Sequence, residues 1–209
     1  MHNHPARFVS AASDPARLPV LAFPEVAFVG RSNVGKSSLL NRLVGQRSLA
    51  RVSKTPGRTQ QINFFLVDES VTFVDLPGYG FARVPAAIRA AWKGLVEGYL
   101  SSRGAQLCAV CVLIDVRRGV ADDDRMLLDY LHSLELRSFV ALTKSDKLAR
   151  GPRLLRCREI AASLPSRTVI ATSAAAGDGM DGIWAEIESA TASGQATKGG
   201  ARRTSSDNR

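Results

Sequence analysis

The feature that most constrains this 209-residue chain is a glycine-rich stretch between an apolar run and a helical pattern. It fits the pattern GxxxxGK[ST], and its residues are Gly30, Arg31, Ser32, Asn33, Val34, Gly35, Lys36 and Ser37. It follows the apolar run EVAFV and opens the helical pattern KSSLLNRLV, which is the context of a phosphate-binding loop. We expect its backbone N–H groups and the helix N-terminus to hold phosphates, with Lys36 at the β- and γ-phosphates and Ser37 on Mg²⁺. The alternative is an ordinary glycine-rich turn, which would not need an apolar run before it and a helical pattern after it.

Short apolar runs alternate with helical patterns along the chain. Strands are predicted at 25–29, 61–67, 71–75, 108–115, 137–142 and 168–171, and helices near 36–44, 86–100, 122–134, 152–163 and 180–189. Continuously apolar strands that alternate with helices indicate a parallel sheet covered on both faces. The short link between 61–67 and 71–75 leaves no room for a crossover, so these two strands should be antiparallel. The predicted fold is an α/β, three-layer α/β/α sandwich, with a six-stranded, mostly parallel sheet that has one antiparallel strand.

The two ends of the chain differ from this central region, which we expect to form one domain at residues 24–190. Residues 1–23 hold three prolines and are expected to form a loosely attached N-terminal arm. Residues 191–209 carry four basic side chains against one acid and no large apolar residue. Such a segment cannot offset its ordering entropy, so a disordered basic tail is expected.

A second motif ends the third predicted strand, and its residues are Asp75, Leu76, Pro77 and Gly78. The carboxyl end of that strand should face the phosphate-binding loop. There Asp75 can hold Mg²⁺ through water, and the Gly78 N–H can bind a γ-phosphate. The pattern DxxG is common by itself, and its position after a phosphate-binding loop is what makes it informative.

A third motif follows the apolar run SFVAL and consists of Thr143, Lys144, Ser145 and Asp146. An aspartate can accept hydrogen bonds from both N1–H and the 2-amino group of guanine, whereas adenine has no matching pair of donors. The wrong base would leave a buried charge unpaired, so we expect guanine selectivity, with the Lys144 stem over the base. The guanine oxygen is expected to meet the backbone N–H groups of Thr172, Ser173 and Ala174. Alone, the tetrad is also compatible with a surface turn.

The order and spacing of these motifs resemble the Ras-like GTPase superfamily of P-loop NTPases. The segments TPGRTQ and DLPGYGFA, with GRSNVGKSSLLN and TKSDK, are similar to the EngB (YihA/YsxC) family of bacterial GTPases, in the TrmE-Era-EngA-EngB-Septin-like class. The resemblance covers about residues 20–190. It implies that Thr59 lies on the first switch loop and joins Ser37 on Mg²⁺ when GTP is bound. It also implies nucleotide contacts for Gly57, Arg58, Thr59, Gln60 and Gln61.

The resemblance implies a GTPase that converts GTP and water to GDP and phosphate, with Lys36, Thr59 and Gly78 as catalytic residues. It further implies a switch in the assembly of the large ribosomal subunit, with precursor rRNA and ribosomal proteins as partners and a link to cell division and septation. Tyr79 stands where Ras carries the glutamine that orients water, so intrinsic hydrolysis should be slow. Two alternatives are a septation scaffold without a direct ribosomal role and a P-loop phosphotransferase with a hydroxyl substrate.

Thr143 is, with Tyr79, a second departure from better-known GTPases, and Asn33 offers a compensation for the missing glutamine or arginine finger. Thr143 stands where many relatives carry asparagine, so part of the polar network around the base should be lost and Asp146 should carry most of the selectivity. Asn33 resembles the residue that holds K⁺ in the MnmE and Der relatives, where the cation stabilises developing charge. The alternative is that Asn33 hydrogen-bonds its own loop backbone, as asparagine readily does.

The chain is basic, with a formal net charge of +9, which points towards polyanions such as nucleic acid, although base-composition bias is the alternative. One basic cluster surrounds the fourth predicted helix: Lys147, Arg150, Arg153, Arg156 and Arg158. It fits either contact with rRNA phosphates or a solvated face. No apolar run is long enough to cross a bilayer, no signal peptide is evident, and the three cysteines are an odd number. We expect a cytoplasmic monomer without membrane insertion.

Overall fold

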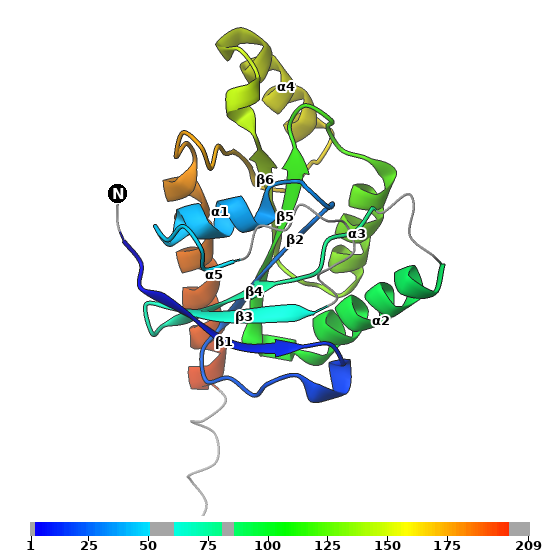
Figure 1. The fold of residues 1–209 in the computed structure, drawn as a ribbon, viewed down its shortest axis with the longest axis vertical. Coiled ribbons are helices and arrows are strands. Elements are labelled where there is room, and N and C mark those ends of the chain that lie inside the picture. The colour runs from blue at the N-terminus through cyan, green and yellow to red at the C-terminus, as the bar shows by residue number, and fades with distance from the viewer. Residues whose placement is uncertain (1–2, 51–60, 81–85, 201–209) are drawn as a thin grey trace, which may run out of the picture.

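The computed structural model describes residues 3–50, 61–80 and 86–200 (Figure 1). The strands in these residues are β1 (Ala6–Ala12), β2 (Glu25–Gly30), β3 (Ile62–Val67), β4 (Val71–Asp75), β5 (Leu107–Asp115), β6 (Ser138–Thr143) and β7 (Val169–Ala171). The α-helices are α1 (Lys36–Leu43), α2 (Ala86–Ser102), α3 (Asp122–Ser133), α4 (Arg150–Ala162) and α5 (Met180–Gly200). Short 3₁₀ helices cover Pro15–Arg17, Gly104–Gln106 and Ser145–Lys147. Every predicted strand and helix is present, and only α5 differs in length by more than two residues.

The strands form one seven-stranded sheet in the order β1-β3-β4-β2-β5-β6-β7. β3 is antiparallel to both of its neighbours, β1 and β4, and the other pairs are parallel. The predicted single antiparallel strand is therefore confirmed. The predicted number of six strands is wrong, because β1 adds a seventh at the edge.

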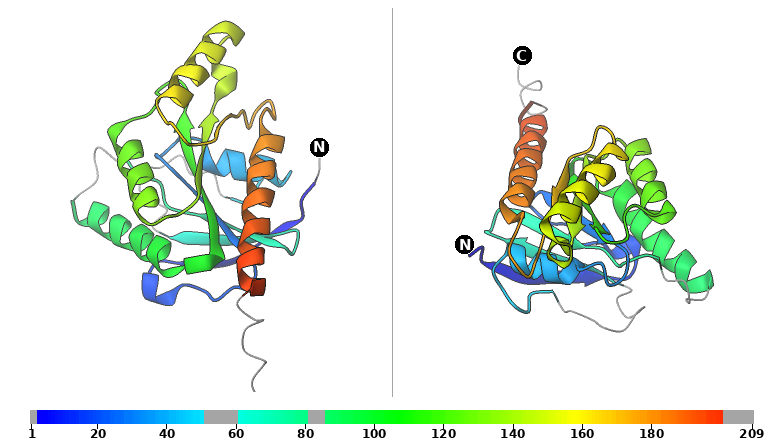
Figure 2. Two further views of the ribbon diagram at one scale, coloured as in Figure 1. Left: turned by 180° about the vertical axis from the view of Figure 1, so that it is seen from behind. Right: turned by 90° about the horizontal axis from the view of Figure 1, so that it is seen from above.

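The helices lie on both faces of the sheet, as the views of Figure 2 show. On one face, α2, α3 and α4 bury apolar residues such as Tyr99, Leu128 and Ile160. On the other face, α1 and α5 bury residues such as Leu40 and Ile187. The alternate residues of the central strands supply both apolar layers, so the predicted three-layer α/β/α sandwich is confirmed.

The segment expected to be a loose arm is part of the sheet. Residues 6–12 pair with β3 as strand β1. Just before this strand, His4 also contacts the body of the protein: its Nδ1 lies 2.5 Å from Asp68 Oδ2, and its ring stacks on Trp184 with the ring centroids 4.0 Å apart. The sequence ARFVSAA has no strict alternation of apolar and polar residues. β1 is an edge strand with one neighbouring strand, and most of its side chains are exposed or half-buried. The pattern of apolar residues in its sequence is therefore weak.

The segment expected to be a disordered tail is helical up to Gly200, because α5 continues past residue 191. Its first turns are held against the sheet by Ile183, Ile187 and Ala190. Once a helix is nucleated by packing, each further residue adds a hydrogen bond without a new nucleation cost. None of the described helices is long and apolar enough to cross a membrane.

A buried charged cluster lies at the amino end of β2. Glu25 is fully buried and accepts hydrogen bonds from the Tyr99 hydroxyl at 2.8 Å and from Arg103 Nε at 3.0 Å. Burial and the neighbouring Glu25 raise the pKa of Tyr99 well above its usual value. Because parallel strands begin here, this cluster is at the opposite end of the sheet from the motifs and serves stability rather than ligand binding.

Candidate functional site

The glycine-rich loop joins the end of β2 to the start of α1, at the carboxyl ends of the parallel strands. Gly35 caps α1 with φ 109°, a conformation that favours glycine, and no side chain in the described residues caps the helix N-terminus. A Cβ on Gly30 would lie 2.8 Å from the Leu113 carbonyl oxygen, so only glycine fits beside β5. The free N–H groups of the first turn of α1 and the helix dipole make this loop suited to bind an anion.

Lys36 and Asp75 lie opposite each other in this loop region. The Lys36 ammonium pairs with the Asp75 carboxylate, and only 12% and 7% of the two side chains are exposed. Asp75 ends β4, the strand beside β2, so its position at the phosphate-binding loop follows from the sheet order. A phosphate bound at this loop would compete with the Asp75 carboxylate for the Lys36 ammonium.

The residues after Asp75 are attached to the loop through the backbone. Ser32 N donates to the Tyr79 carbonyl oxygen at 3.0 Å, and Tyr79 N donates to the Gly30 carbonyl oxygen at 3.2 Å. A Cβ on Gly78 would lie 3.2 Å from Ser32 Oγ, so glycine allows this close approach. Leu76 is buried beneath the turn, and Pro77 completes it. The second motif thus lies against the first.

Tyr79 points away from this backbone contact and towards α3. Its hydroxyl donates to the buried Asp124 at 2.6 Å, and Asp124 also accepts from Ala121 N at the start of the helix. Burial and then the Asp124 charge raise the pKa of Tyr79 far above its usual value. The Tyr79 phenol is therefore neutral and fixed to α3. The sequence placed Asp124 only in the first helical turn and did not reveal this contact.

The third motif packs against the first through Lys144. Lys144 has φ 59°, and its ammonium donates to the Asn33 carbonyl oxygen at 2.7 Å. Ser145 N donates to the Thr172 carbonyl oxygen at 3.1 Å, which fixes the tetrad beside residues 172–174. This arrangement brings the predicted base-binding residues next to the phosphate-binding loop.

Asp146 is held in its ionised form by its neighbours. Ser173 Oγ donates to Asp146 Oδ1 at 2.7 Å, and this hydrogen bond is the main reason that the pKa of Asp146 is lowered. Ser173 Oγ also accepts from Ala176 N at 3.0 Å, and Ala174 lies in the same turn. A carboxylate with a fixed orientation is what recognition of two guanine N–H groups requires.

Thr143, which stands where many relatives carry asparagine, still makes polar contacts with the phosphate-binding loop and with β5. Its hydroxyl is buried and lies 2.7 Å from the Val34 carbonyl oxygen and 3.3 Å from the Ile114 carbonyl oxygen. Threonine therefore ties the end of β6 to the phosphate-binding loop.

Other predicted site residues have different positions. Gln61 is exposed and lies just before β3. It is at the end of the sheet that holds the motifs, because Asn63 of β3 pairs with Asp75 at the end of β4. Asn33 is exposed with φ 62°. The predicted contacts of four residues lie outside the described part of the chain: Gly57, Arg58, Thr59 and Gln60.

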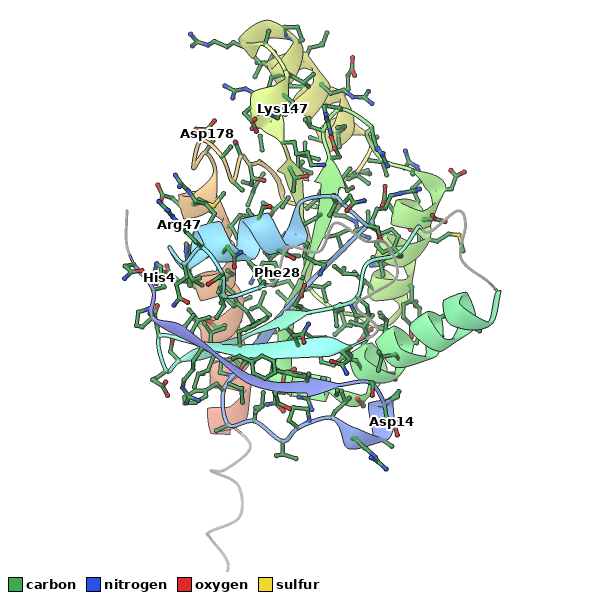
Figure 3. The ribbon with its side chains drawn as sticks, viewed as in Figure 1. His4, Asp14, Phe28, Arg47, Lys147 and Asp178 are labelled. Atoms are coloured by element: carbon green, nitrogen blue, oxygen red, sulfur yellow. The ribbon has the colours of Figure 1, made fainter. Side chains whose placement is uncertain are left out.

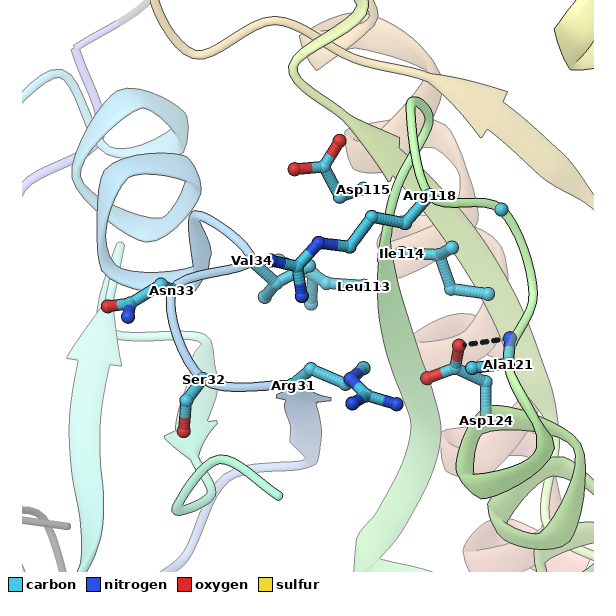
Figure 4. Close-up of a pocket in the computed structure, with 11 residues that line it drawn as sticks. Arg31, Ser32, Asn33, Val34, Leu113, Ile114, Asp115, Arg118, Ala121 and Asp124 are labelled. Atoms are coloured by element: carbon cyan, nitrogen blue, oxygen red, sulfur yellow. Dashed lines mark hydrogen bonds between the residues drawn. The ribbon is translucent and has the colours of Figure 1, made fainter. Parts of the chain in front are cut away.

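A hollow of about 200 Å³ lies between the phosphate-binding loop and the loop after β5 (Figure 4). Arg31 and Arg118 extend into it, and Arg31 pairs with Asp123 at 3.3 Å. Asp115, also in its lining, ends the long apolar run of β5. That position at a strand end beside β2 is the signal from which sequence reasoning could have found Asp115.

The base-binding motif and the turn before α5 lie at the same end of the molecule, where Figure 3 labels Lys147, in the short 3₁₀ helix after β6, and Asp178, in that turn. A phosphate-binding loop, a strand-end aspartate and a guanine-type tetrad meet at the carboxyl ends of the strands. This fold and this set of contacts define a P-loop GTPase.

Comparison with known proteins identifies the family. Residues 25–144 match the family described as 50S ribosome-binding GTPase. The chain is 46% identical over 196 residues to the probable GTP-binding protein EngB of Geobacter sulfurreducens, covering 90% of this chain and 92% of that protein. It is 48% identical over 185 residues to the corresponding protein of Syntrophus aciditrophicus, covering 88% and 93%. The chain belongs to the EngB family of GTP-binding proteins.

A solved structure supports the fold. The crystal structure of a probable GTP-binding protein EngB superposes with a TM-score of 0.67 at 24% identity. The superposition covers 81% of this chain and 99% of that chain.

Proposed function

We propose that this protein is a GTP-dependent switch in the assembly of the large ribosomal subunit, and that its link to cell division and septation runs through this role. The convergence of three motifs, joined by Lys36–Asp75 and Lys144–Asn33, supports the nucleotide site. Membership of a family described as 50S ribosome-binding GTPase supports the partner. The proposed functional unit is residues 24–190 together with β1, which completes the sheet, and it is proposed to act as a monomer in the cytoplasm on precursor rRNA and ribosomal proteins.

Mg²⁺ fits the donors of the proposed site. The Ser37 hydroxyl is a hard oxygen ligand that Thr59 is proposed to join, and the Asp75 carboxylate is proposed to hold the ion through water. The described residues contain no group of three His, Cys, Asp or Glu side chains that could hold a metal alone. This suits an ion that takes other ligands from phosphates and water. When bound, Mg²⁺ would neutralise charge on the β- and γ-phosphates.

Hydrolysis in this site is proposed to be slow, at or below about 10⁻⁴ s⁻¹ without a partner. Lys36, Thr59 and the Gly78 N–H are the proposed groups that stabilise the transferred phosphoryl group. Tyr79 cannot orient water, because its hydroxyl is bound to Asp124.

K⁺ beside Asn33 is a proposed substitute for a missing arginine finger. We expect faster hydrolysis in KCl than in NaCl, and we expect Asn33→Ala to remove the difference. Equal wild-type rates in the two salts would contradict a role for K⁺.

The face around α4 is the proposed contact with rRNA. Ile160 is the one buried residue of this helix, and the face carries exposed Arg150 and Arg158 beside half-buried Arg153. Arg153 pairs with Asp178, whereas Arg156 donates to the carbonyl oxygens of Val116 and Arg118 in the loop after β5. The exposed arginines of α4 are not needed to pack this helix on the sheet. They are therefore suited to contact phosphates.

Co-sedimentation with large ribosomal subunits tests the proposal. Binding is expected with a non-hydrolysable GTP analogue, should be weaker with GDP, and should fall as salt is raised, because phosphate contacts release counterions. Lys36→Ala is the control that removes the nucleotide response. No binding in either nucleotide state would contradict the ribosomal role and favour the septation scaffold.

A further inference from the structure

Asp115 is a buried carboxylate beside the nucleotide site that none of the three motifs contains. It ends β5, and its Oδ2 lies 3.1 Å from the Lys144 ammonium. The same ammonium donates to the Asn33 carbonyl oxygen. Lys144 is therefore fixed at two points, one on the phosphate-binding loop and one on the neighbouring strand.

Asp115 also has a structural role in its own turn. Its Oδ1 accepts from Arg117 N at 3.1 Å, and the Arg117 guanidinium holds both carboxylate oxygens at 2.9 and 2.6 Å. Burial alone would raise the pKa of Asp115, but the hydrogen bonds from Arg117 and Lys144 outweigh it and bring the pKa well below its usual value. The carboxylate is thus charged at neutral pH and faces Lys144 as an anion.

A free lysine side chain samples many rotamers, and ordering it costs conformational entropy. If the ammonium is already held by Asp115 and Asn33, the lysine stem is ordered before a base arrives. Preorganisation of this kind increases affinity without adding a contact to the ligand.

We propose that Asp115 is a positioning residue for guanine nucleotides, which acts by holding the Lys144 stem in place to cover the base. The inference rests on the proposed function, because that assigns Lys144 to the base. Asp115 acts on the base through Lys144 and so lowers the rate at which nucleotide leaves.

Asp115→Asn removes the negative charge that pairs with both Lys144 and the Arg117 guanidinium. Asparagine keeps an oxygen that can accept from Arg117 N and so keeps the turn. It loses the charge that attracts Lys144. We expect GDP affinity to fall roughly tenfold, mainly through faster release measured with a fluorescent GDP analogue. The charge-retaining Asp115→Glu should recover part of the loss.

A double-variant cycle shows whether Asp115 acts through Lys144. Lys144→Ala should weaken GDP binding, and adding Asp115→Asn should weaken it no further. Glu25→Gln is the matched control, because Glu25 is also a buried carboxylate paired with an arginine, but it lies at the other end of the sheet. It should lower the melting temperature and leave GDP affinity unchanged.

The outcomes distinguish this inference from the proposed site. Two results would overturn the positioning role of Asp115 and leave the proposed role of Lys144 at the base intact. One is a wild-type GDP affinity in Asp115→Asn, and the other is a double variant whose fold-loss of GDP affinity is the product of the two single losses. Unchanged GDP binding in Lys144→Ala would overturn both roles. A loss of affinity in Glu25→Gln equal to that in Asp115→Asn would reduce the effect to general stability and so overturn the inference.

Discussion

Single side chains join the three motifs into one site. Thr143 ties the base-binding strand to the phosphate-binding loop, Ser173 orients Asp146, and Asp75 receives Lys36. These contacts link the three motifs to one another, so we expect single substitutions in them to change nucleotide binding.

Asp146→Asn should exchange guanine for xanthine selectivity. The asparagine amide N–H would face the 2-amino group of guanine, which is also a donor. Xanthine carries a carbonyl oxygen at C2 in place of this amino group and can accept from the amide. We expect GDP affinity to fall by about 100-fold or more and xanthosine diphosphate to become the better ligand, measured by titration. Asp178→Asn, in the adjacent turn and paired with Arg153, is the control and should bind GDP normally. Unchanged GDP affinity in Asp146→Asn would remove this residue from the base site.

Thr143→Val should cost about 1–3 kcal/mol of stability, because it removes the donor to the buried Val34 carbonyl oxygen. Nucleotide affinity should fall with it, since the loop loses its tie to β6. Thr143→Ser keeps the hydroxyl and should behave nearly as wild type in the same unfolding and titration experiments. If valine and serine give the same values, the hydroxyl has no such role.

At the level of elements, the sheet shows what a sequence can and cannot predict. The central strands and helices were predictable because apolar runs and helical periods are local signals. β1 was not, because an edge strand has one partner and a weak pattern. In the site, the motif residues were predictable, whereas the roles of Asp115 and Asp124 depend on which elements are neighbours in space. That information is tertiary.

Removal of residues 1–12 should expose the edge of β3. We expect a lower melting temperature and aggregation seen by light scattering, because an unpaired strand edge invites pairing with other chains. His4→Ala is the matched control: it removes the contact with Asp68 and Trp184 but keeps β1, so it should remain monodisperse. A truncated chain as stable and monomeric as wild type would show that β1 is dispensable.

For the whole molecule, stability and ligand binding lie at opposite ends of the sheet. The Glu25, Tyr99 and Arg103 cluster is at one end, and the nucleotide site is at the other. A substitution in the Glu25 cluster should therefore change stability without touching the nucleotide site.

Bound nucleotide should stabilise the whole fold. At a GDP concentration of about 100 times Kd, linkage predicts about 2.7 kcal/mol of added stability and a higher melting temperature. Lys36→Ala should show no such shift at that concentration, although it also loses its partner Asp75 and so needs its own ligand-free baseline. A full shift in Lys36→Ala would exclude the phosphate-binding loop as the ligand site.

The stacking of His4 on Trp184 has a consequence for the order in which the molecule is completed during translation. β1 leaves the ribosome well before its partner β3 is synthesised, and α5, the helix that carries Trp184, is synthesised after both of these strands. Until then, the apolar face that α5 covers remains open on the nascent chain. Final folding must therefore wait until α5 has been synthesised, and synthesis interrupted before it would leave an intermediate with exposed apolar surface that is prone to aggregate.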